Sequence, residues 1–157
     1  MSSYLSFYLV PKKTKTKYGY NEKDGHTEEV VEVSKGEPLL LMSYSRNNEV
    51  YQAYKETLNP AYAGNEDKYT ELTYDDAKRV IDEFEDDVKK TEKRLAIAYK
   101  MLKEGGYSED LYTEINSTEQ YLNEQKEVIQ DLKNIANLVY ECSNSWTDFE
   151  KVLINVD

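Results

Sequence analysis

The sequence predicts an α+β fold in which a small, mostly antiparallel sheet and one short helix carry a long antiparallel, coiled-coil-like helical hairpin. Three observations predict this class. The first sixty residues hold three short apolar segments, residues 73–141 hold two long runs with heptad spacing, and residues 149–156 return to strand composition. We expect a single domain over residues 1–157, with 73–141 forming the hairpin.

Four strands are expected to form the sheet, three from the N-terminal part of the chain and one near its end. The segment Tyr4–Val10 is aromatic and β-branched and stops at Pro11, and Glu29–Ser34 is a second short strand. Leu39–Tyr44 is apolar enough to be buried on both faces of the sheet. Phe149–Val156 is the closing strand, and the polar residues between the first two strands form a long connection.

A short helix follows the third strand. Asn47 or Asn48 is suited to cap its N-terminus. Helical spacing then places four apolar or aromatic residues on one stripe: Val50, Tyr51, Tyr54 and Leu58. Asn59-Pro60 is expected to end this helix, and residues 61–72 form a polar loop.

The helical hairpin is the clearest pattern in the chain. Thr73 is a good N-cap, Gly105-Gly106 ends the first helix, and Ser108 caps the second. Seam residues recur every four and three positions, at Ala77, Ile81, Phe84, Val88, Thr91, Leu95, Ala98 and Leu102, and again at Leu111, Ile115, Thr118, Leu122, Gln125, Ile129, Leu132, Ala136 and Val139. The short link makes the helices antiparallel neighbours, and a length of about 45 Å each makes their far end project.

Charge is concentrated in the hairpin. The chain has 31 acidic and 20 basic side chains and a net charge of −11, yet residues 1–60 are balanced. Residues 73–88 carry seven acids against two bases, whereas residues 89–104 carry six bases against two acids. The second helix has five acids and no base over residues 109–124, beside the basic half of the first. The hairpin base therefore holds the excess negative charge, which repels nucleic acid and anionic lipid and suits a basic protein surface.

The stretch DDAKRVIDEFEDD supplies the candidate partner-binding carboxylates. They are Asp75, Asp76, Asp82, Glu83, Glu85, Asp86 and Asp87. Ile81 and Phe84 are seam residues, so the carboxylates face outward, which disfavours a metal site or a catalytic carboxylate pair. Two interpretations stay open: a rigid row of acids that imitates a phosphate backbone, or the solvated face of a helix whose N-terminal acids complement the macrodipole.

No catalytic residue, metal site or cofactor is predicted. The one histidine, His26, and the one cysteine, Cys142, are not linked by any motif, and the chain has neither a Gly-rich phosphate loop nor an EF-hand. One cysteine excludes an internal disulfide, and no apolar run is long enough to span a membrane. We therefore expect a cytoplasmic protein.

Two other segments are candidate binding regions. A ligand pocket between the sheet and the short helix would be formed by Arg46, Asn47, Asn48, Tyr51 and Tyr54. Four lysines between Lys12 and Lys17, with Tyr18 and Tyr20 after them, form a small basic and aromatic arm. On a chain with a net charge of −11 this arm is better explained as a charged flank that protects a strand edge, so no direct nucleic-acid binding is expected.

These observations favour a non-enzymatic, acidic protein-binding module, such as a small phage-type viral inhibitor that docks on the basic, nucleic-acid-binding surface of a partner protein. The 15 tyrosines fit this role because Tyr is enriched at interfaces. Two alternatives stay open. One is a structural or assembly component that forms homo-oligomers through the hairpin or a sheet edge, and the other is a small-ligand or nucleotide-binding module that uses the Arg46–Tyr54 region.

Overall fold

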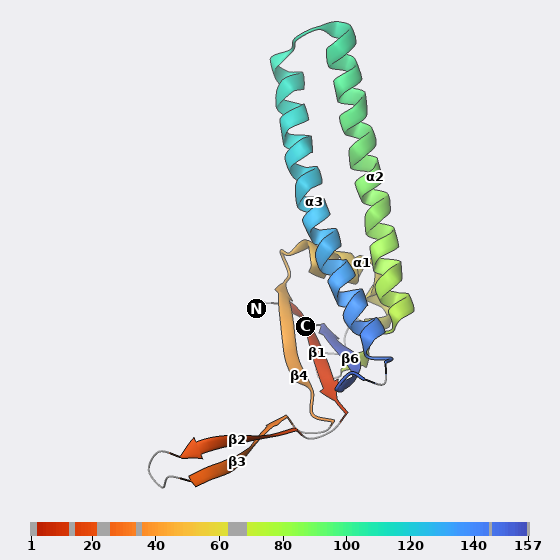
Figure 1. The fold of residues 1–157 in the computed structure, drawn as a ribbon. Coiled ribbons are helices and arrows are strands. Elements are labelled where there is room, and N and C mark those ends of the chain that lie inside the picture. The colour runs from red at the N-terminus through yellow and green to blue at the C-terminus, as the bar shows by residue number, and fades with distance from the viewer. Residues whose placement is uncertain are drawn as a thin grey trace.

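A computed structural model of the chain shows a sheet and a short helix forming a body from which a long helical hairpin projects (Figure 1). The structure describes residues 3–12, 15–21, 26–33, 36–62, 69–144 and 146–156, with the backbone alone for 15–21, 26–33 and 59–62. In chain order the elements are β1 Tyr4–Pro11, β2 Lys15–Asn21, β3 His26–Val33, β4 Leu39–Ser45, α1 Glu49–Tyr62, β5 Thr70–Glu71, α2 Tyr74–Gly105, α3 Glu109–Glu141 and β6 Phe149–Val156. The predicted α+β class with a helical hairpin is confirmed.

The main sheet is antiparallel and has four strands in the order β4-β1-β6-β5. Its central strand β1 places Phe7 opposite Met42 of β4 and Ile154 of β6. Alternation in β1 buries Leu5 and Phe7, and these side chains join a core cluster with residues of α1, α2, α3 and β6. The sheet therefore presents one face to the helices, as expected for a half-buried antiparallel sheet.

The membership of the sheet differs from the prediction. The predicted second strand, Glu29–Ser34, falls in β3, which pairs with β2 in a separate two-stranded ribbon. The ribbon lies away from the hairpin (Figure 1). The strand β2 lies in the stretch predicted to be a connection, because that stretch has no periodicity and contains two glycines. The fourth strand of the main sheet is instead β5, whose two residues are too short for any periodicity to show.

The prediction that Leu39–Tyr44 is buried on both faces is wrong. Leu40 is 61% exposed and Leu41 is 39% exposed. The physical reason is position, because β4 is an edge strand with β1 on one side only. An apolar run does not distinguish a central strand from an edge strand.

Helix α1 confirms the predicted stripe and corrects the predicted end. The side chain of Asn48 accepts a hydrogen bond from the Val50 backbone N–H at 2.8 Å, which caps the helix. All four stripe residues are buried: Val50, Tyr51, Tyr54 and Leu58. The backbone stays helical through Tyr62, so Asn59-Pro60 does not end the helix. Pro60 lies in the last turn, where its missing N–H removes a single backbone hydrogen bond.

The hairpin forms as its spacing predicts. Thr73 caps α2 and Ser108 caps α3, and Gly106 adopts a φ of +78°, which a residue without Cβ tolerates. Every predicted seam residue is buried or half-buried. We call residues 74–88 and 126–141 the near half, beside the body, and residues 89–105 and 109–125 the far half, which projects (Figure 1). The near half also buries Val80 and Ile135, which the seam pattern did not include.

Candidate protein-binding surface at the base of the hairpin

The seven candidate carboxylates lie on the first turns of α2. This helix begins at Tyr74 because Thr73, in an extended conformation, accepts a hydrogen bond from the Asp76 backbone N–H at 3.2 Å. Asp75 and Asp76 then lie in the first turn, where the helix dipole favours negative charge. Local structure thus accounts for two of the acids, and the other five need a different explanation.

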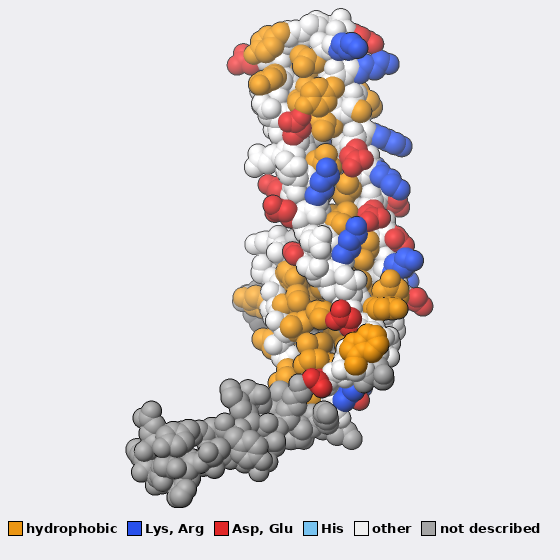
Figure 2. Space-filling model, viewed as in Figure 1, with side chains coloured by type: hydrophobic (Ala, Val, Ile, Leu, Met, Phe, Trp, Pro, Cys, Tyr) orange, Lys and Arg blue, Asp and Glu red, His pale blue; other side chains and the backbone are white. Residues whose placement is uncertain are grey.

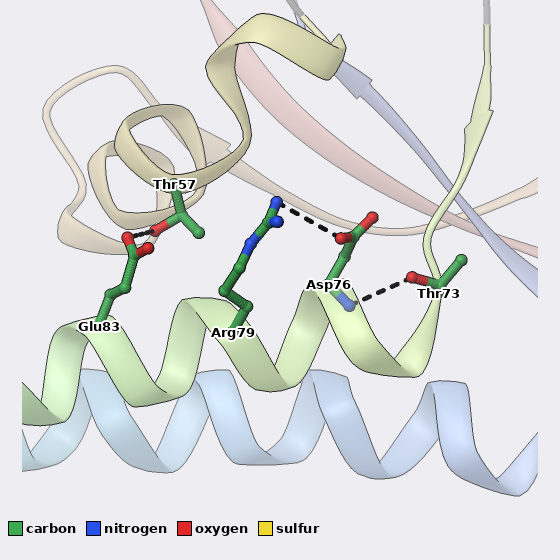
Figure 3. A network of polar contacts seen from close by, with 5 residues as sticks. All are labelled: Thr57, Thr73, Asp76, Arg79 and Glu83. Carbon is green, nitrogen blue, oxygen red and sulfur yellow. Dashed lines mark hydrogen bonds and ion pairs between the residues drawn. The ribbon is translucent and has the colours of Figure 1, made fainter.

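Four of the seven carboxylates already have partners within the chain. Asp76 pairs with Arg79 at 3.4 Å, and Asp87 pairs with Lys90 at 4.0 Å, both along α2. Glu85 reaches across to Lys133 of α3 at 3.7 Å. Glu83 accepts a hydrogen bond of 2.6 Å from the Thr57 hydroxyl of α1 (Figure 3). Glu85 thus links the two helices and Glu83 attaches the hairpin to the body, while Asp76 and Asp87 are paired within α2. All four acids are less available to a partner.

The other three carboxylates face solvent. Asp75, Asp82 and Asp86 are exposed and form no ion pair or hydrogen bond with any residue the structure describes. They are spaced seven and four residues apart, so they lie on one face of α2. This face is opposite the seam, because Phe84 and Val88 point toward α3. The structure therefore reduces the predicted acidic surface to a row of three.

Exposed aromatic side chains lie at the same end of the hairpin. The rings of Tyr74 and Tyr140 pack at a centroid distance of 5.6 Å and tilt by 58°. Both border a groove of about 310 Å³ whose apolar lining includes Leu72, Val139 and Val152. Trp146, in the turn after α3, is 80% exposed. The 15 tyrosines are evident in the sequence, but which of them are exposed depends on tertiary packing and gives no local sequence signal.

Cys142 also borders this groove but is not an activated thiol. Burial raises the pKa of the Cys142 thiol above its ordinary value, and Glu141 raises it further while Lys12 opposes both. A raised pKa keeps the thiol protonated at neutral pH, and the protonated form is a poor nucleophile. The side chain of His26, the other residue considered for catalysis, lies outside the described residues.

The structure disperses the predicted ligand-binding residues. Asn48 is used as the cap of α1, and the Arg46 carbonyl accepts a hydrogen bond from the Gln52 side chain at 2.6 Å. Tyr51 and Tyr54 are buried in the core, where the Tyr54 ring packs edge-on against Phe7. Arg46 and Asn47 are exposed at the start of the helix. The five residues therefore do not converge on one opening.

The basic arm can be placed only in part. The Lys12 ammonium donates a hydrogen bond to the Asn144 carbonyl at 2.9 Å, which ties the end of β1 to the turn after α3. Lys13 lies outside the described residues, as do the side chains of Lys15, Lys17, Tyr18 and Tyr20. The expectation that this arm is a charged strand flank without direct nucleic-acid binding stays a prediction.

Comparison with known proteins finds no match: no protein-family model, no curated protein and no solved structure is significantly similar to this chain. Within the described part of the chain, no three His, Cys, Asp or Glu side chains are grouped to hold a metal ion. None of the described helices is both long and apolar enough to cross a membrane.

Proposed function

We propose that this protein is a non-enzymatic protein-binding module that docks the base of its hairpin on a basic surface of a partner, such as the nucleic-acid-binding surface of another protein. The observation that carries the proposal is the row of Asp75, Asp82 and Asp86, three exposed carboxylates without a partner among the described residues. Carboxylates fixed on a rigid helix give a partner a defined pattern of charge at low entropic cost.

The aromatic residues at the same end of the hairpin would contribute binding affinity beyond that of the charged residues. Affinity at protein interfaces is concentrated in a few buried side chains, most often Trp, Tyr and Arg. Tyr74 and Tyr140 are exposed and border the apolar groove, and Trp146 is exposed in the turn after α3. An arginine-rich partner surface could place its guanidinium groups on these rings and between the acids.

The spacing of the row sets the kind of mimicry. Asp75 to Asp86 spans about 16 Å of helix, and a duplex of that length presents about ten phosphates. Three carboxylates do not reproduce that density. The proposed surface therefore competes for a basic site through charge and aromatic contacts together and does not copy a phosphate backbone along its length.

The test is capture of basic proteins from a cell lysate by the immobilised chain. Changing Asp75→Asn, Asp82→Asn and Asp86→Asn together is expected to remove the captured set, and Trp146→Ala should weaken it. A matched control, Glu104→Gln, Glu109→Gln and Asp110→Asn, removes the same charge at the tip of the hairpin and should leave capture intact. Equal capture by both triple variants would show that the base of the hairpin is not the docking surface.

A further inference from the structure

The solvent-facing row of α2 continues beyond the three acids. From Asp75 to Lys100 its charged members without an ion pair to a described residue are three acids followed by three lysines: Asp75, Asp82, Asp86, Lys89, Lys93 and Lys100. Arg79, which is paired with Asp76, lies beside this row, and Glu104 in the last turn of the helix lies beyond it. All six side chains are exposed, and none is joined by an ion pair or hydrogen bond to another described residue. Their spacings of seven, four, three, four and seven residues keep them on one helical face.

The order of charges in this row is a palindrome with the sign reversed. From the N-terminal end the acids are separated by seven and then four residues, and the bases are separated by four and then seven. A second α2 laid antiparallel, with its centre between Asp87 and Val88, places every acid opposite a lysine. The pairs are Asp75 with Lys100, Asp82 with Lys93, and Asp86 with Lys89, and two-fold symmetry forms each pair twice.

From this register we propose that two copies of the chain associate antiparallel along the outer faces of their α2 helices, through six reciprocal ion pairs. The two bases within the acidic half fit the same register. Lys78 meets Ile97 and Arg79 meets Ala96, so neither faces a like charge. The paired row is about 38 Å long, which spreads the contacts along most of the helix.

The helix dipole does not account for the pattern. Its influence falls off within the first and last turns, whereas Asp86 and Lys89 lie in the middle of the 32-residue helix. Asp82 with Asp86, and Lys89 with Lys93, are like charges four residues apart, and such pairs destabilise an isolated helix. An opposing row of reversed sign relieves both repulsions.

The face is open to a second copy. In Figure 1 the side of α2 that faces away from α3 runs free along the hairpin, and Figure 2 shows basic side chains along its far half. Helix α1 contacts α2 at Glu83, which accepts the hydrogen bond from Thr57 (Figure 3), and the six residues of the row stay exposed. Exposed ion pairs are individually weak and are screened by salt, so the pairing is expected to be reversible and salt-dependent.

Charge reversal tests the pairing directly by sedimentation equilibrium, at protein concentrations up to about 1 mM. The acid-reversed chain carries D75K, D82K and D86K, and the base-reversed chain carries K89E, K93E and K100E. In a homodimer of either chain, like charges face each other. We therefore expect the dissociation constant of each homodimer to rise by about tenfold or more over that of the wild-type chain. An equimolar mixture restores all six pairs and should form a one-to-one heterodimer.

The control reverses three exposed acids on α3, with E109K, E127K and D131K, and so makes the same change in net charge as the acid-reversed chain. It should still self-associate. A wild-type chain that stays monomeric at about 1 mM, or a mixture that associates no more than its separate components, would overturn the proposal.

Cross-linking gives a second readout that depends on the register. With Cys142→Ser in both chains, a chain with D82C and a chain with K93C should form a mixed disulfide under mild oxidation. D82C alone should not, because its two copies of position 82 lie about 16 Å apart along the paired helices. A D82C homodimer that forms as readily as the mixed one contradicts the antiparallel register.

The self-association and the docking proposal both use the same three acids, but only the self-association also uses the three lysines. Changing Lys89→Gln, Lys93→Gln and Lys100→Gln should abolish pairing and leave capture of a basic partner at least as strong. Loss of capture with pairing intact in the Trp146→Ala chain would support both proposals. Pairing that survives the lysine changes rejects the self-association alone.

Discussion

The near and far halves of the hairpin share one seam spacing but bury different side chains. In the near half all buried seam and flanking residues are apolar: Ala77, Val80, Phe84, Val88, Leu132, Ile135 and Ala136. In the far half three of the six buried residues are polar, namely Thr91, Thr118 and Gln125. The near half packs into the core cluster of the body, whereas Ala98 and Ile115 of the far half lie outside that cluster.

This difference in buried residues indicates that the two halves have different structural roles. The near half is a core element, buried on the seam and on the side that faces the body. Beyond Leu122, which joins the core cluster, the far half is held by its partner helix, through a seam with more polar residues, the Arg94–Glu114 pair at 3.9 Å and a hydrogen bond from the Tyr99 hydroxyl to Glu119. Ile97, Met101 and Tyr112 of the far half and Tyr107 of the connecting turn are exposed. Figure 2 shows hydrophobic side chains on the surface at this end of the hairpin. Because such a segment has few buried apolar contacts, we expect it to open locally before the body unfolds.

The largest expected effect comes from a cavity in the near half. Leu132 is 0% exposed and belongs to the core cluster. Leu132→Ala removes buried apolar surface and leaves a cavity, so we expect the free energy of unfolding to fall by about 2–5 kcal/mol. Chemical denaturation followed by far-UV circular dichroism measures this loss.

The matched change in the far half is Ile115→Ala, at a residue that is also buried. We expect a smaller shift in the global midpoint, together with faster amide hydrogen exchange confined to residues 89–125. Equal losses in the free energy of global unfolding from the two variants would show that the hairpin unfolds as one cooperative unit. The two halves would then not differ in local stability.

The sequence predicted the hairpin well because its determinants are local. Heptad spacing, the caps Thr73 and Ser108, and the Gly105-Gly106 stop all act within a few residues of where they stand. Val80 and Ile135 lie off the heptad stripe and are buried only because the body covers that side of the near half. No sequence pattern within α2 or α3 indicates this contact with the body.

The same limit applies to the strands and to the surface. Leu40 has the composition of a core residue but is exposed, because the place of a strand within a sheet is decided by distant pairing. The sign-reversed order of charges from Asp75 to Lys100 is visible in the sequence. Its meaning required the structure, because Glu85 and Asp87 carry the same charge as Asp86 but are paired within the chain.

A smaller effect is expected at the boundary of the two halves. Gln125 is 2% exposed, and its side-chain oxygen has no hydrogen-bond partner among the described residues. A buried acceptor without a partner costs about 1–3 kcal/mol, and the hydrogen bond between Gln125 and Tyr121 offsets part of this. Gln125→Leu should therefore stabilise the chain by about 1 kcal/mol, seen as a rise of about 2–4 °C in Tm.

The conservative control for this change is Gln125→Glu, which places a charge in the same buried position and should lower Tm instead. A Tm that falls for Gln125→Leu as well would mean that the polar side chain is held by contacts that a leucine cannot replace. The far half would then depend on its polar seam residues for stability and not only for register.

The smallest effect concerns Glu49, where α1 meets the far half. Burial raises the pKa of the Glu49 carboxyl above its ordinary value of 4.5, and the charge of Glu124 raises it further. The folded chain thus binds this proton more tightly than the unfolded chain, so the contribution of Glu49 to stability falls as pH rises through and above about 4.5. Glu49→Gln removes that loss, and its Tm should exceed the wild-type Tm at pH 7 but match it below about pH 4.

Glu56→Gln removes the same charge elsewhere on α1, at an exposed position, and should shift Tm little at either pH. The sign of the Glu49 effect also decides between two opposing influences. Glu49 lies in the first turn of α1, where the helix dipole favours a carboxylate. A lower Tm for Glu49→Gln at pH 7 would mean that the dipole outweighs burial and Glu124. The negative charge of Glu49 would then stabilise the chain in spite of its burial and its repulsion from Glu124.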